Sequence, residues 1–407
     1  MRYKKNIYII VVDGMPDIPQ GITALKKASK PNIDTLAKNG IVGRFLPISK
    51  KNWNKTAFAS ASQIGNLGIL GYDASKYYVR RGPLEAIGAD LEYQNGWLAI
   101  RGDIATVDEN LIIKDRRAGR NILGLDLLID DLNEKIHVGY KFHMQRTFGH
   151  RVSLVFKTND LSDKITDSDP FKTGVRPNKV KPLNRRSKKA VRTAKVLNEF
   201  LKKFHELAKK HRVNVDRIAK GILPANYLLT RDAGTSLPKL ESFFSMFGFD
   251  NGVAIAENGV MKATCKLVGF ESIAVPEMSH ESMLDFAFEK AKHPSVKRKY
   301  QIIYMHLKGV DEAGHDKNLE KKIKAIEEID YRMEYFIDRD DIVILLSDHR
   351  TDYRTGKHEY GYVPVLIYGL GKDNYKKFDE FTAMKSRLIF NTGKQLWRFI
   401  AKRFEKE

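Results

Sequence analysis

The sequence of 407 residues predicts an α/β protein with a central, mostly parallel sheet that helices flank and an inserted α+β domain interrupts. Two observations support this prediction. Continuous apolar runs rich in β-branched residues occur near both ends of the chain, as in strands that are buried on both faces of a parallel sheet. The middle, from about residue 80 to 238, instead mixes short strand-like pieces, turn signals and one long basic helix. We expect a core of residues 1–78 and 240–407 and an insert of residues 79–239.

The apolar runs of the core each end near a polar residue. A first strand is predicted over residues 6–12, which Asp13 and Gly14 follow, and a helix is predicted to start at Pro31 and to stop at Gly40. Further strands are predicted over residues 300–307, 341–346 and 363–368. Open α/β sheets bind ligands at the carboxyl ends of their strands. We therefore expect one metal or phosphate site at this edge.

The chain is strongly basic, with 71 Lys and Arg against 50 Asp and Glu and a formal net charge of +21. Residues 179–220 contain 15 basic and three acidic residues. Apolar residues recur there at helical spacing, namely Ala190, Ala194, Leu197, Leu201, Phe204 and Ala208. We interpret the basic side as a solvated helix face. An RNA-binding face and loose contact with acidic partners are the alternatives, but no nucleic-acid partner is expected, since interleaved aromatics and known RNA-binding patterns are absent.

The cysteine content and the lengths of the apolar runs exclude several classes of protein. Cys265 is the only cysteine, so an internal disulfide and a cysteine metal cluster are excluded, and any metal must bind to oxygen and nitrogen. The longest apolar run near the N-terminus, residues 7–12, is too short to span a bilayer, and no signal-peptide pattern follows it. We expect a soluble, cytoplasmic protein without a membrane partner, for which an anionic small molecule is a possible substrate.

Four segments carry the candidate residues of the site. They are Asp13; Ser62 in the segment 61–66; Asp311 with His315; and Asp348 with His349, followed by His358. The spacing of Asp311 and His315 places both side chains on one face if that turn is helical. Such donors suit Mn²⁺, Zn²⁺ or Co²⁺, whereas Mg²⁺ prefers more oxygen. Each segment alone is as typical of a turn, a helix cap or a surface pair, and only their joint placement at strand ends indicates a metal site.

These segments belong to a longer series of motifs spread over nearly the whole chain. The motifs are residues 11–15 (VVDGM), 30–37 (KPNIDTLA), 70–73 (LGYD), 81–86 (RGPLEA), 115–120 (DRRAGR), 149–151 (GHR), 168–170 (SDP), 224–226 (PAN), 306–316 (HLKGVDEAGHD) and 348–349 (DH) with His358. Together they resemble the archaeal type of cofactor-independent phosphoglycerate mutase in the alkaline phosphatase superfamily. The resemblance implies an alkaline-phosphatase-like metal domain interrupted by a domain that holds the glycerate.

The resemblance also implies the chemistry of the site. One divalent metal would bind to Asp13, Asp348 and His349 with Ser62, and a second to Asp311, His315 and His358. Ser62 would be the nucleophile that forms phosphoserine, and Lys308 would help to stabilise the phosphoryl group. The ions would be Mn²⁺, or Mg²⁺, Co²⁺ or Zn²⁺, and 2,3-bisphosphoglycerate would not be required. The implied reaction interconverts 3- and 2-phosphoglycerate in glycolysis and gluconeogenesis. The oligomeric state stays open, with a homo-oligomer possible.

Basic residues of the insert are the candidates for holding the substrate carboxylate. They are Arg101, Arg116, Arg117, Arg120, Arg151 and, more weakly, Arg231. A guanidinium offers a bidentate fork to a carboxylate, although surface ion pairs are the alternative use of each arginine. Lys262 stands where relatives place a substrate-contacting lysine. Asp115 is the candidate proton shuttle between the glycerate hydroxyls, ahead of His150.

The segment around the nucleophile departs from the family pattern. Members usually show Gly-Ser-Asp-Thr-(Ser/Ala)-His, whereas this chain has Ala61-Ser62-Gln63-Ile64-Gly65-Asn66. Gln63 thus removes a negative charge, and Asn66 replaces an imidazole by an amide. Two other functions stay open: a related phosphatase or phosphotransferase, including homoserine-kinase-like enzymes, and a nucleic-acid-binding protein without activity.

Overall fold

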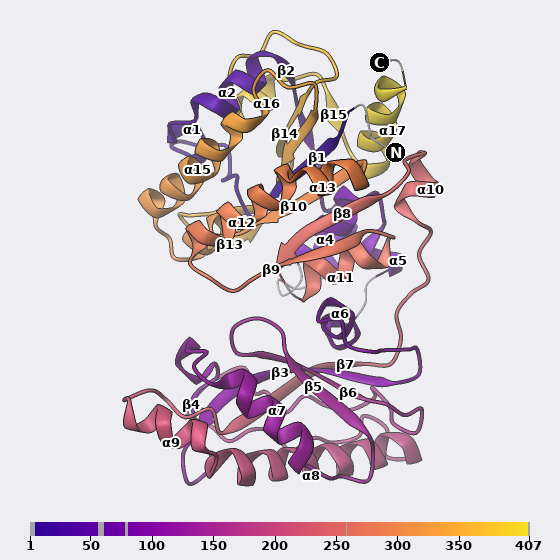
Figure 1. Cartoon of the computed structure of the whole chain (residues 1–407), viewed down its shortest axis with the longest axis vertical. Helices are drawn as coiled ribbons and strands as arrows, with labels where there is room; N and C mark the ends of the chain where they lie inside the picture. Colours follow the sequence, from indigo (N-terminus) through magenta and orange to yellow (C-terminus); the bar gives the residue numbers. More distant parts are fainter. Residues whose placement is uncertain (1–4, 56–60, 78–79, 258, 406–407) are drawn as a thin grey trace. The chain divides into compact units, whose positions relative to one another are not determined.

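The computed structural model describes residues 5–55, 61–77, 80–257 and 259–405 (Figure 1). Its internal contacts divide the chain into two compact units. Unit 1 comprises Met1–Tyr78, Leu240–Glu257 and Thr264–Glu407, and unit 2 comprises Val79–Lys239 and Asn258–Ala263.

Unit 1 contains an eight-stranded mixed sheet in the order β15-β2-β14-β11-β1-β10-β8-β9. Its strands are β1 (Ile7–Val12), β2 (Gly40–Phe45), β8 (Gly252–Glu257), β9 (Glu271–Val275), β10 (Ile302–Leu307), β11 (Ile342–Leu346), β14 (Val363–Tyr368) and β15 (Ile389–Phe390). The central strands β11, β1, β10, β8 and β9 run parallel, whereas β14 is antiparallel to both of its neighbours. The predicted α/β class with a largely parallel sheet is confirmed.

Both faces of this sheet are buried. Successive side chains of a strand point to opposite faces, so each strand contributes to two apolar clusters. Tyr8 and Ile10 of β1 belong to one apolar cluster, and Ile7 and Ile9 belong to the other. Helices α1 (Ala24–Lys27), α2 (Pro31–Lys38), α12 (His280–Lys292), α13 (Pro294–Lys299), α15 (Leu319–Met333) and α16 (Glu380–Lys385) contribute to the first cluster. Helices α4 (Ala61–Ile69), α5 (Ala74–Tyr77), α10 (Phe243–Phe247), α11 (Val260–Leu267) and α17 (Gly393–Phe404) contribute to the second. The parallel strands are therefore covered on both sides, as such sheets require.

Unit 2 is built on a five-stranded antiparallel sheet of β4 (Ile113–Asp115), β3 (Leu98–Val107), β6 (Arg151–Phe156), β5 (Phe142–Arg146) and β7 (Tyr227–Gly234). Helices α7 (Leu125–Lys135) and α8 (Lys188–Lys209) lie along one face of the sheet in Figure 1 and share its apolar core. Ala86 of α6 (Arg81–Gly88) packs with Ala99 and Val155 in a separate cluster. In α8 the predicted apolar stripe is buried, and Lys202, Lys209 and the residue that follows the helix, Lys210, are exposed.

Short elements complete the two units. In unit 1 they are α3 (Lys50–Lys55), α14 (Val310–His315), the 3₁₀ turn Glu334–Phe336 and the hairpin of β12 (Arg350–Asp352) and β13 (Lys357–Glu359). In unit 2 they are α9 (Arg212–Ala219) and the 3₁₀ turn Ala118–Arg120. None of the described helices combines the length and the apolar composition that a membrane span requires.

The predicted strands at residues 6–12, 300–307, 341–346 and 363–368 are confirmed to within two residues at each end. Strand β2 was not predicted. It begins at Gly40, which was expected only to stop a helix. Gly40 has room for no side chain, since a Cβ there would lie 2.7 Å from the carbonyl oxygen of Ile367. Only short strand-like pieces were expected in the middle of the chain, whereas β3 has ten residues and continues to Val107.

A buried arginine supports the loop that carries the motif DRRAGR in unit 2. Arg217 of α9 is fully buried, and its guanidinium donates to four backbone carbonyls. The acceptors are the carbonyls of Leu223 at 2.9 Å, Asn121 at 3.1 Å, Leu123 at 2.9 Å and Ala118 at 3.0 Å. A planar group with five N–H donors is suited to satisfying several acceptors at once. Arg217 therefore fixes the loop over residues 118–123.

We predict that Arg217→Met lowers the free energy of unfolding by about 2–4 kcal/mol, because buried carbonyls lose their donors. Denaturant unfolding followed by circular dichroism measures the change, and Arg192→Met, at an exposed position of α8, is the matched control with an expected change within about 0.5 kcal/mol. Equal stability of the two variants would show that other donors replace the guanidinium.

Candidate metal centre

Three adjacent parallel strands deliver the acidic residues of unit 1 to one edge of the sheet. Strand β1 lies between β10 and β11, and Val12 is in register with Leu307, while Val11 is in register with Leu346. The chain leaves these strands into Asp13, into α14 with Asp311, and into Asp348. The three carboxylates are thus neighbours although the sequence separates them widely.

The first ligand group consists of Asp13, Asp348 and His349, whose candidate ligand atoms all lie within 4.8 Å of one another. All three residues are buried. His349 Nε2 lies 3.0 Å from Asp13 Oδ1 and 3.7 Å from Asp348 Oδ1. The backbone N–H of Gly14 donates to Asp348 at 3.3 Å.

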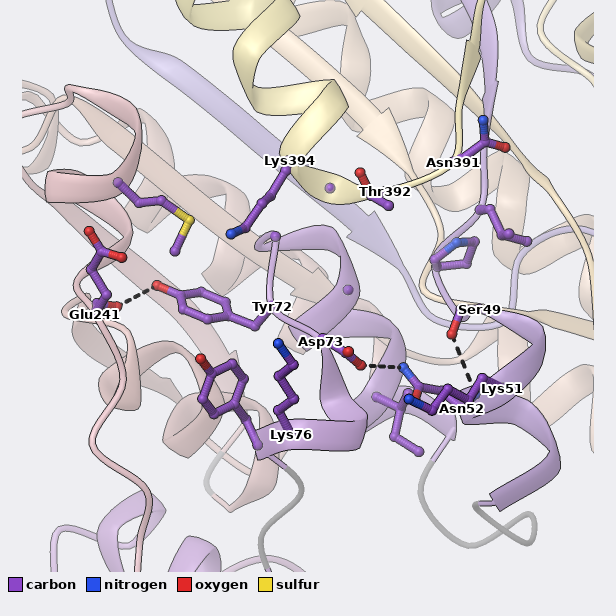
Figure 2. Close-up of a pocket in the computed structure, with 18 residues that line it drawn as sticks. Ser49, Lys51, Asn52, Tyr72, Asp73, Lys76, Glu241, Asn391, Thr392 and Lys394 are labelled. Carbon is purple, nitrogen blue, oxygen red and sulfur yellow. Dashed lines mark hydrogen bonds between the residues drawn. The ribbon is translucent and has the colours of Figure 1, made fainter.

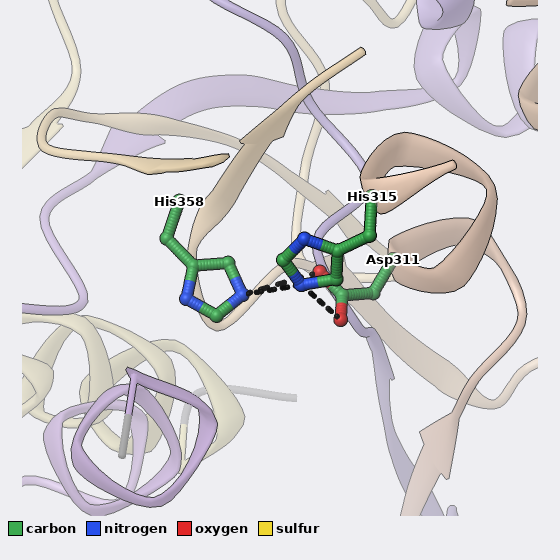
Figure 3. A group of neighbouring side chains, drawn as sticks. All are labelled: Asp311, His315 and His358. Carbon is green, nitrogen blue, oxygen red and sulfur yellow. Dashed lines mark hydrogen bonds and ion pairs between the residues drawn. The ribbon is translucent and has the colours of Figure 1, made fainter. Parts of the chain in front are cut away.

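The second ligand group consists of Asp311, His315 and His358, which point toward one another in Figure 3. His315 Nε2 lies 3.3 Å from Asp311 Oδ2, and His358 Nε2 lies 3.5 Å from Asp311 Oδ1. Helix α14 contains both Asp311 and His315, so the helical turn that their spacing predicted is present. His358 comes from β13, where it is in register with Thr351 of β12.

The two groups adjoin each other. The imidazole rings of His349 and His358 have centroids 4.2 Å apart. The hydroxyl of Thr351 hydrogen-bonds Asp311 and lies 3.1 Å from His349 Nδ1. Thr351 thus links the two groups. No pattern in the sequence indicated this role, which depends on the pairing of Thr351 with His358 across the hairpin.

The protonation behaviour of the groups reflects crowded negative charge. Burial raises the pKa of Asp13, and the nearby carboxylates of Asp348 and Asp311 raise it further. Burial alone would lower the pKa of His349, but Asp348 and Asp13 together raise it to about 10. A hydrogen bond to Asp311 raises the pKa of His315 to about 9. Buried carboxylates that attract positive charge in this way, together with imidazole nitrogens, form a donor set that fits divalent cations.

Ser62 lies beside the first group, in the opening turn of α4. Its Oγ is 3.1 Å from His349 Nε2 and 3.4 Å from Asp13 Oδ1. Gly65 allows the helix to come this close, since a Cβ at that position would lie only 2.1 Å from the carbonyl oxygen of Asp348. The hydroxyl therefore faces the candidate metal ligands.

Three side chains support Asp348, and two of them, Tyr304 and His306, were not singled out from the sequence. Asn66 Nδ2 donates to Asp348 Oδ2 at 3.0 Å and to the carbonyl of Ser62 at 2.7 Å, and the Tyr304 hydroxyl donates to Asn66. His306 Nε2, fully buried in β10, lies 3.4 Å from Asp348 Oδ2. Two polar side chains inside an otherwise apolar strand were the available signal. The amide at position 66 thus supports the same carboxylate and serine that define the site.

Lys308 follows β10, and its Nζ lies 3.0 Å from Glu257 Oε2 at the end of β8. Both residues belong to unit 1. Its ammonium group is therefore already paired with a carboxylate that the sequence analysis did not consider.

Half of the arginines predicted to hold substrate form ion pairs within unit 2. Arg101 is buried with its Nη1 3.3 Å from Glu85 and its Nη2 3.6 Å from Asp103. Arg231 lies 2.6 Å from Asp103 as well. Arg116 binds Asp169 through two hydrogen bonds, of 3.0 and 2.5 Å. These three match the ion-pair alternative considered for each arginine.

The other three, Arg117, Arg120 and Arg151, form no salt bridge with any residue in the described part of the chain. Burial lowers the pKa of Arg117, and the charges of Arg120 and Arg116 lower it further. Arg81, which the sequence analysis did not single out, has its pKa lowered to about 10 by burial and by nearby Arg101. Unit 2 thus concentrates positive charge that internal carboxylates do not fully compensate.

The remaining predicted residues of unit 2 have defined partners. Asp115 accepts hydrogen bonds from the backbone N–H groups of Arg117 at 2.6 Å and Gly119 at 3.1 Å. His150 Nε2 lies 3.5 Å from Asp103, and burial lowers its pKa to about 4, so it is neutral near pH 7. Lys262 is buried and pairs with Asp90. Asp115 therefore shapes the arginine-bearing loop in this structure.

Comparison with known proteins identifies the family. A family model described as 2,3-bisphosphoglycerate-independent phosphoglycerate mutase matches residues 37–214. The chain is 36% identical over 397 residues to the protein of that name from Thermoplasma volcanium, covering 95% of this chain and 94% of the relative. The same name belongs to a relative from Methanosphaera stadtmanae, 36% identical over 390 residues and covering 93% of each chain.

A solved structure is also similar to this chain. It is the cofactor-independent phosphoglycerate mutase from Thermoplasma acidophilum, 30% identical, with 97% of this chain and 98% of that chain covered and a TM-score of 0.61. Identity at this level over almost the whole length shows that the chain belongs to the 2,3-bisphosphoglycerate-independent phosphoglycerate mutase family.

Proposed function

We propose that this protein interconverts 3-phosphoglycerate and 2-phosphoglycerate through a phosphoserine at Ser62. The observation that carries the proposal is the position of Ser62 Oγ, 3.1 Å from His349 Nε2 and 3.4 Å from Asp13 Oδ1, at the edge of a buried acidic site. Family membership supports the choice of substrate and a reaction without added 2,3-bisphosphoglycerate. Its place would be glycolysis and gluconeogenesis, in the cytoplasm.

The two ligand groups would each hold one divalent cation, with Mn²⁺ the first choice and Mg²⁺, Co²⁺ or Zn²⁺ as alternatives. Asp13, Asp348 and His349 with Ser62 would hold one, and the Asp311, His315 and His358 group would hold the other. Bound cations would supply the positive charge that lowers the pKa of a serine hydroxyl and neutralises phosphoryl oxygens. The donor set fits, since each group combines a carboxylate with an imidazole.

The proposed transfer exchanges one bond to phosphorus for another and moves one proton. Ser62 Oγ forms a bond to phosphorus while the bond from phosphorus to the glycerate oxygen breaks. The serine loses its hydroxyl proton, and the departing glycerate oxygen gains one. Transfer back to the other glycerate hydroxyl reverses these changes and leaves Ser62 free. Asn66 keeps Ser62 in place through its hydrogen bond to the serine carbonyl at 2.7 Å.

Unit 2 would serve as the inserted domain that holds the glycerate between the two transfers. Arg117, Arg120 and Arg151 are the residues best suited to grip a carboxylate, because internal ion pairs do not engage them among the described residues. Arg101, Arg116 and Arg231 would instead hold the surrounding residues in place through their ion pairs with Glu85, Asp103 and Asp169.

Three further residues keep their predicted roles as proposals. Lys262, held by Asp90, would contact the substrate, and Lys308, held by Glu257, would stabilise charge on the phosphoryl group. Asp115 would move a proton between the glycerate hydroxyls, and His150, neutral near pH 7, is the alternative.

We predict that Ser62→Ala lowers kcat for 3-phosphoglycerate conversion by at least about 10³-fold, because no nucleophile replaces the hydroxyl. A coupled enolase assay measures the rate, and the melting temperature checks the fold. Ser245→Ala, at an exposed position of α10, is the matched control and should retain full activity. Turnover by Ser62→Ala at the control's rate would remove Ser62 from the mechanism.

Removal of metal should abolish activity. We predict that EDTA inactivates the enzyme, that Mn²⁺ restores it and that added 2,3-bisphosphoglycerate has no effect. Native mass spectrometry should find two Mn²⁺ per chain, and one after either Asp348→Asn or Asp311→Asn, since each group loses a charged ligand. The exposed Asp338→Asn is the control. Full activity of the metal-free protein, or a requirement for 2,3-bisphosphoglycerate, contradicts the proposal.

Metal binding should release protons. Without metal, His349 has a pKa of about 10 and His315 of about 9, so both are protonated near pH 7. A metal binds the neutral imidazole, so it must displace these protons, and the affinity for Mn²⁺ should rise with pH between about 6 and 9. Calorimetry in two buffers with different ionisation enthalpies counts the released protons. An affinity for Mn²⁺ that does not change with pH, with no proton released on binding, would contradict this prediction.

A further inference from the structure

We propose that a second pocket of unit 1, separate from the metal centre, binds an aromatic organic phosphate of about the size of a nucleoside monophosphate. The pocket has a volume of about 400 Å³, which falls in the range of small-molecule sites. Its wall is formed by α4, α5, the first turn of α17 and the segment after β2 (Figure 2). None of the candidate metal ligands lines it.

Three lysines from three different elements line this pocket. Lys51 belongs to α3, Lys76 to α5 and Lys394 to α17. No salt bridge joins any of them to another residue within the described ranges. Figure 2 shows the side chains of Lys76 and Lys394 extending into the space around Tyr72. Ammonium groups that line one pocket, where they outnumber the carboxylates, provide a place for an anion.

Two carboxylates also line the pocket, and Asp73 lies close enough to Lys51 for the lysine charge to help lower its pKa. Asp73 accepts hydrogen bonds from Asn52 Nδ2 at 3.1 Å and from the backbone N–H of Ser75 at 2.9 Å. Glu241 lies beyond Tyr72 in Figure 2, and its backbone carbonyl accepts the Tyr72 hydroxyl at 2.7 Å. The lysines outnumber these carboxylates, so the charge of the pocket is positive overall.

The amino end of α17 adds to this positive charge. Helix α17 has 12 residues, begins at Gly393 and directs its first turn at the pocket. Its close approach depends on Gly393 and Gly68, since a Cβ on Gly393 would lie 2.1 Å from the carbonyl oxygen of Gly68. A Cβ on Gly68 would in turn lie 1.9 Å from the carbonyl oxygen of Pro47. The positive end of the helix dipole therefore acts together with Lys394 on a bound phosphate.

The rest of the wall is apolar and aromatic. Tyr72 and Tyr77, whose rings meet edge to face with centroids 6.2 Å apart, line it together with Ile64 and Met246. Tyr72 is buried, so the partly exposed Tyr77 offers the more accessible ring. Aromatic faces bind flat rings, and base–aromatic stacking contributes about 1–3 kcal/mol per base. A cationic end next to an aromatic wall thus selects a phosphate that is joined to a ring, rather than a free phosphate.

The pocket contacts the helix that carries the proposed nucleophile. Ile64 and Gly68 of α4 line the pocket, whereas Ser62 and Asn66 of the same helix make the contacts described for the metal centre. A ligand in the pocket would therefore touch α4 on a different side from the reacting groups. Such a ligand would leave the candidate metal ligands uncovered, because none of them lines the pocket.

Titration calorimetry with adenosine monophosphate tests the proposal on the full-length protein loaded with Mn²⁺ and saturated with 3-phosphoglycerate, so that the catalytic site is filled. We expect one site per chain, weakened at least about 10-fold by the double variant Lys76→Ala/Lys394→Ala, which removes two charged contacts. Arg398→Ala/Lys402→Ala is the matched control: it removes two exposed charges from α17 outside the pocket and should leave the affinity unchanged.

Titration with inorganic phosphate shows whether the pocket recognises the phosphate alone or a phosphate joined to a ring. Inorganic phosphate should bind at least about 10-fold more weakly than adenosine monophosphate, because it lacks the ring. No binding of adenosine monophosphate at millimolar concentration to the protein saturated with 3-phosphoglycerate, or equal affinities of the two double variants, would overturn the proposal.

Discussion

The crowding of three carboxylates at one edge of a parallel sheet is the constraint on which the rest of unit 1 depends. Asp13, Asp311 and Asp348 meet because β1 lies between β10 and β11, and parallel strands end on the same side. Burial and mutual repulsion raise the pKa of Asp13, while His349 becomes far more basic than usual. Such an arrangement is stable only with compensating positive charge, which protons supply without metal and divalent cations would supply more effectively.

Neutral donors and close backbone contacts bring α4 and the proposed nucleophile to this charged edge. Gly65 lets α4 approach the backbone of Asp348, and Asn66 connects that carboxylate to the serine at the start of the same helix. From β10, Tyr304 hydrogen-bonds Asn66, and His306 contacts Asp348. The hydroxyl of Ser62, the proposed nucleophile, is thereby held against the acidic site. An amide at position 66 suits this task, because it donates and accepts at once.

Much of this arrangement could be predicted from local sequence. Apolar runs predicted β1, β10, β11 and β14, and the spacing of Asp311 and His315 predicted their common helical face. What escaped prediction depends on partners far apart in the chain. Arg231 of β7 meets Asp103 of the antiparallel strand β3, Arg101 meets Glu85 of α6, and His306 of β10 meets Asp348, which follows β11 on the other side of β1. Such pairings depend on strand order, which no single segment encodes.

The central claim is that the phosphoryl group passes through Ser62, and rapid-quench mass spectrometry tests it most directly. The Mn²⁺-loaded enzyme is mixed with 3-phosphoglycerate, quenched in acid within one turnover and digested. The account predicts one added phosphoryl group on the peptide that contains Ser62, which appears before 2-phosphoglycerate and decays as product forms. A phosphoryl group on another residue, or turnover in which no protein phosphorylation ever appears, would contradict the account.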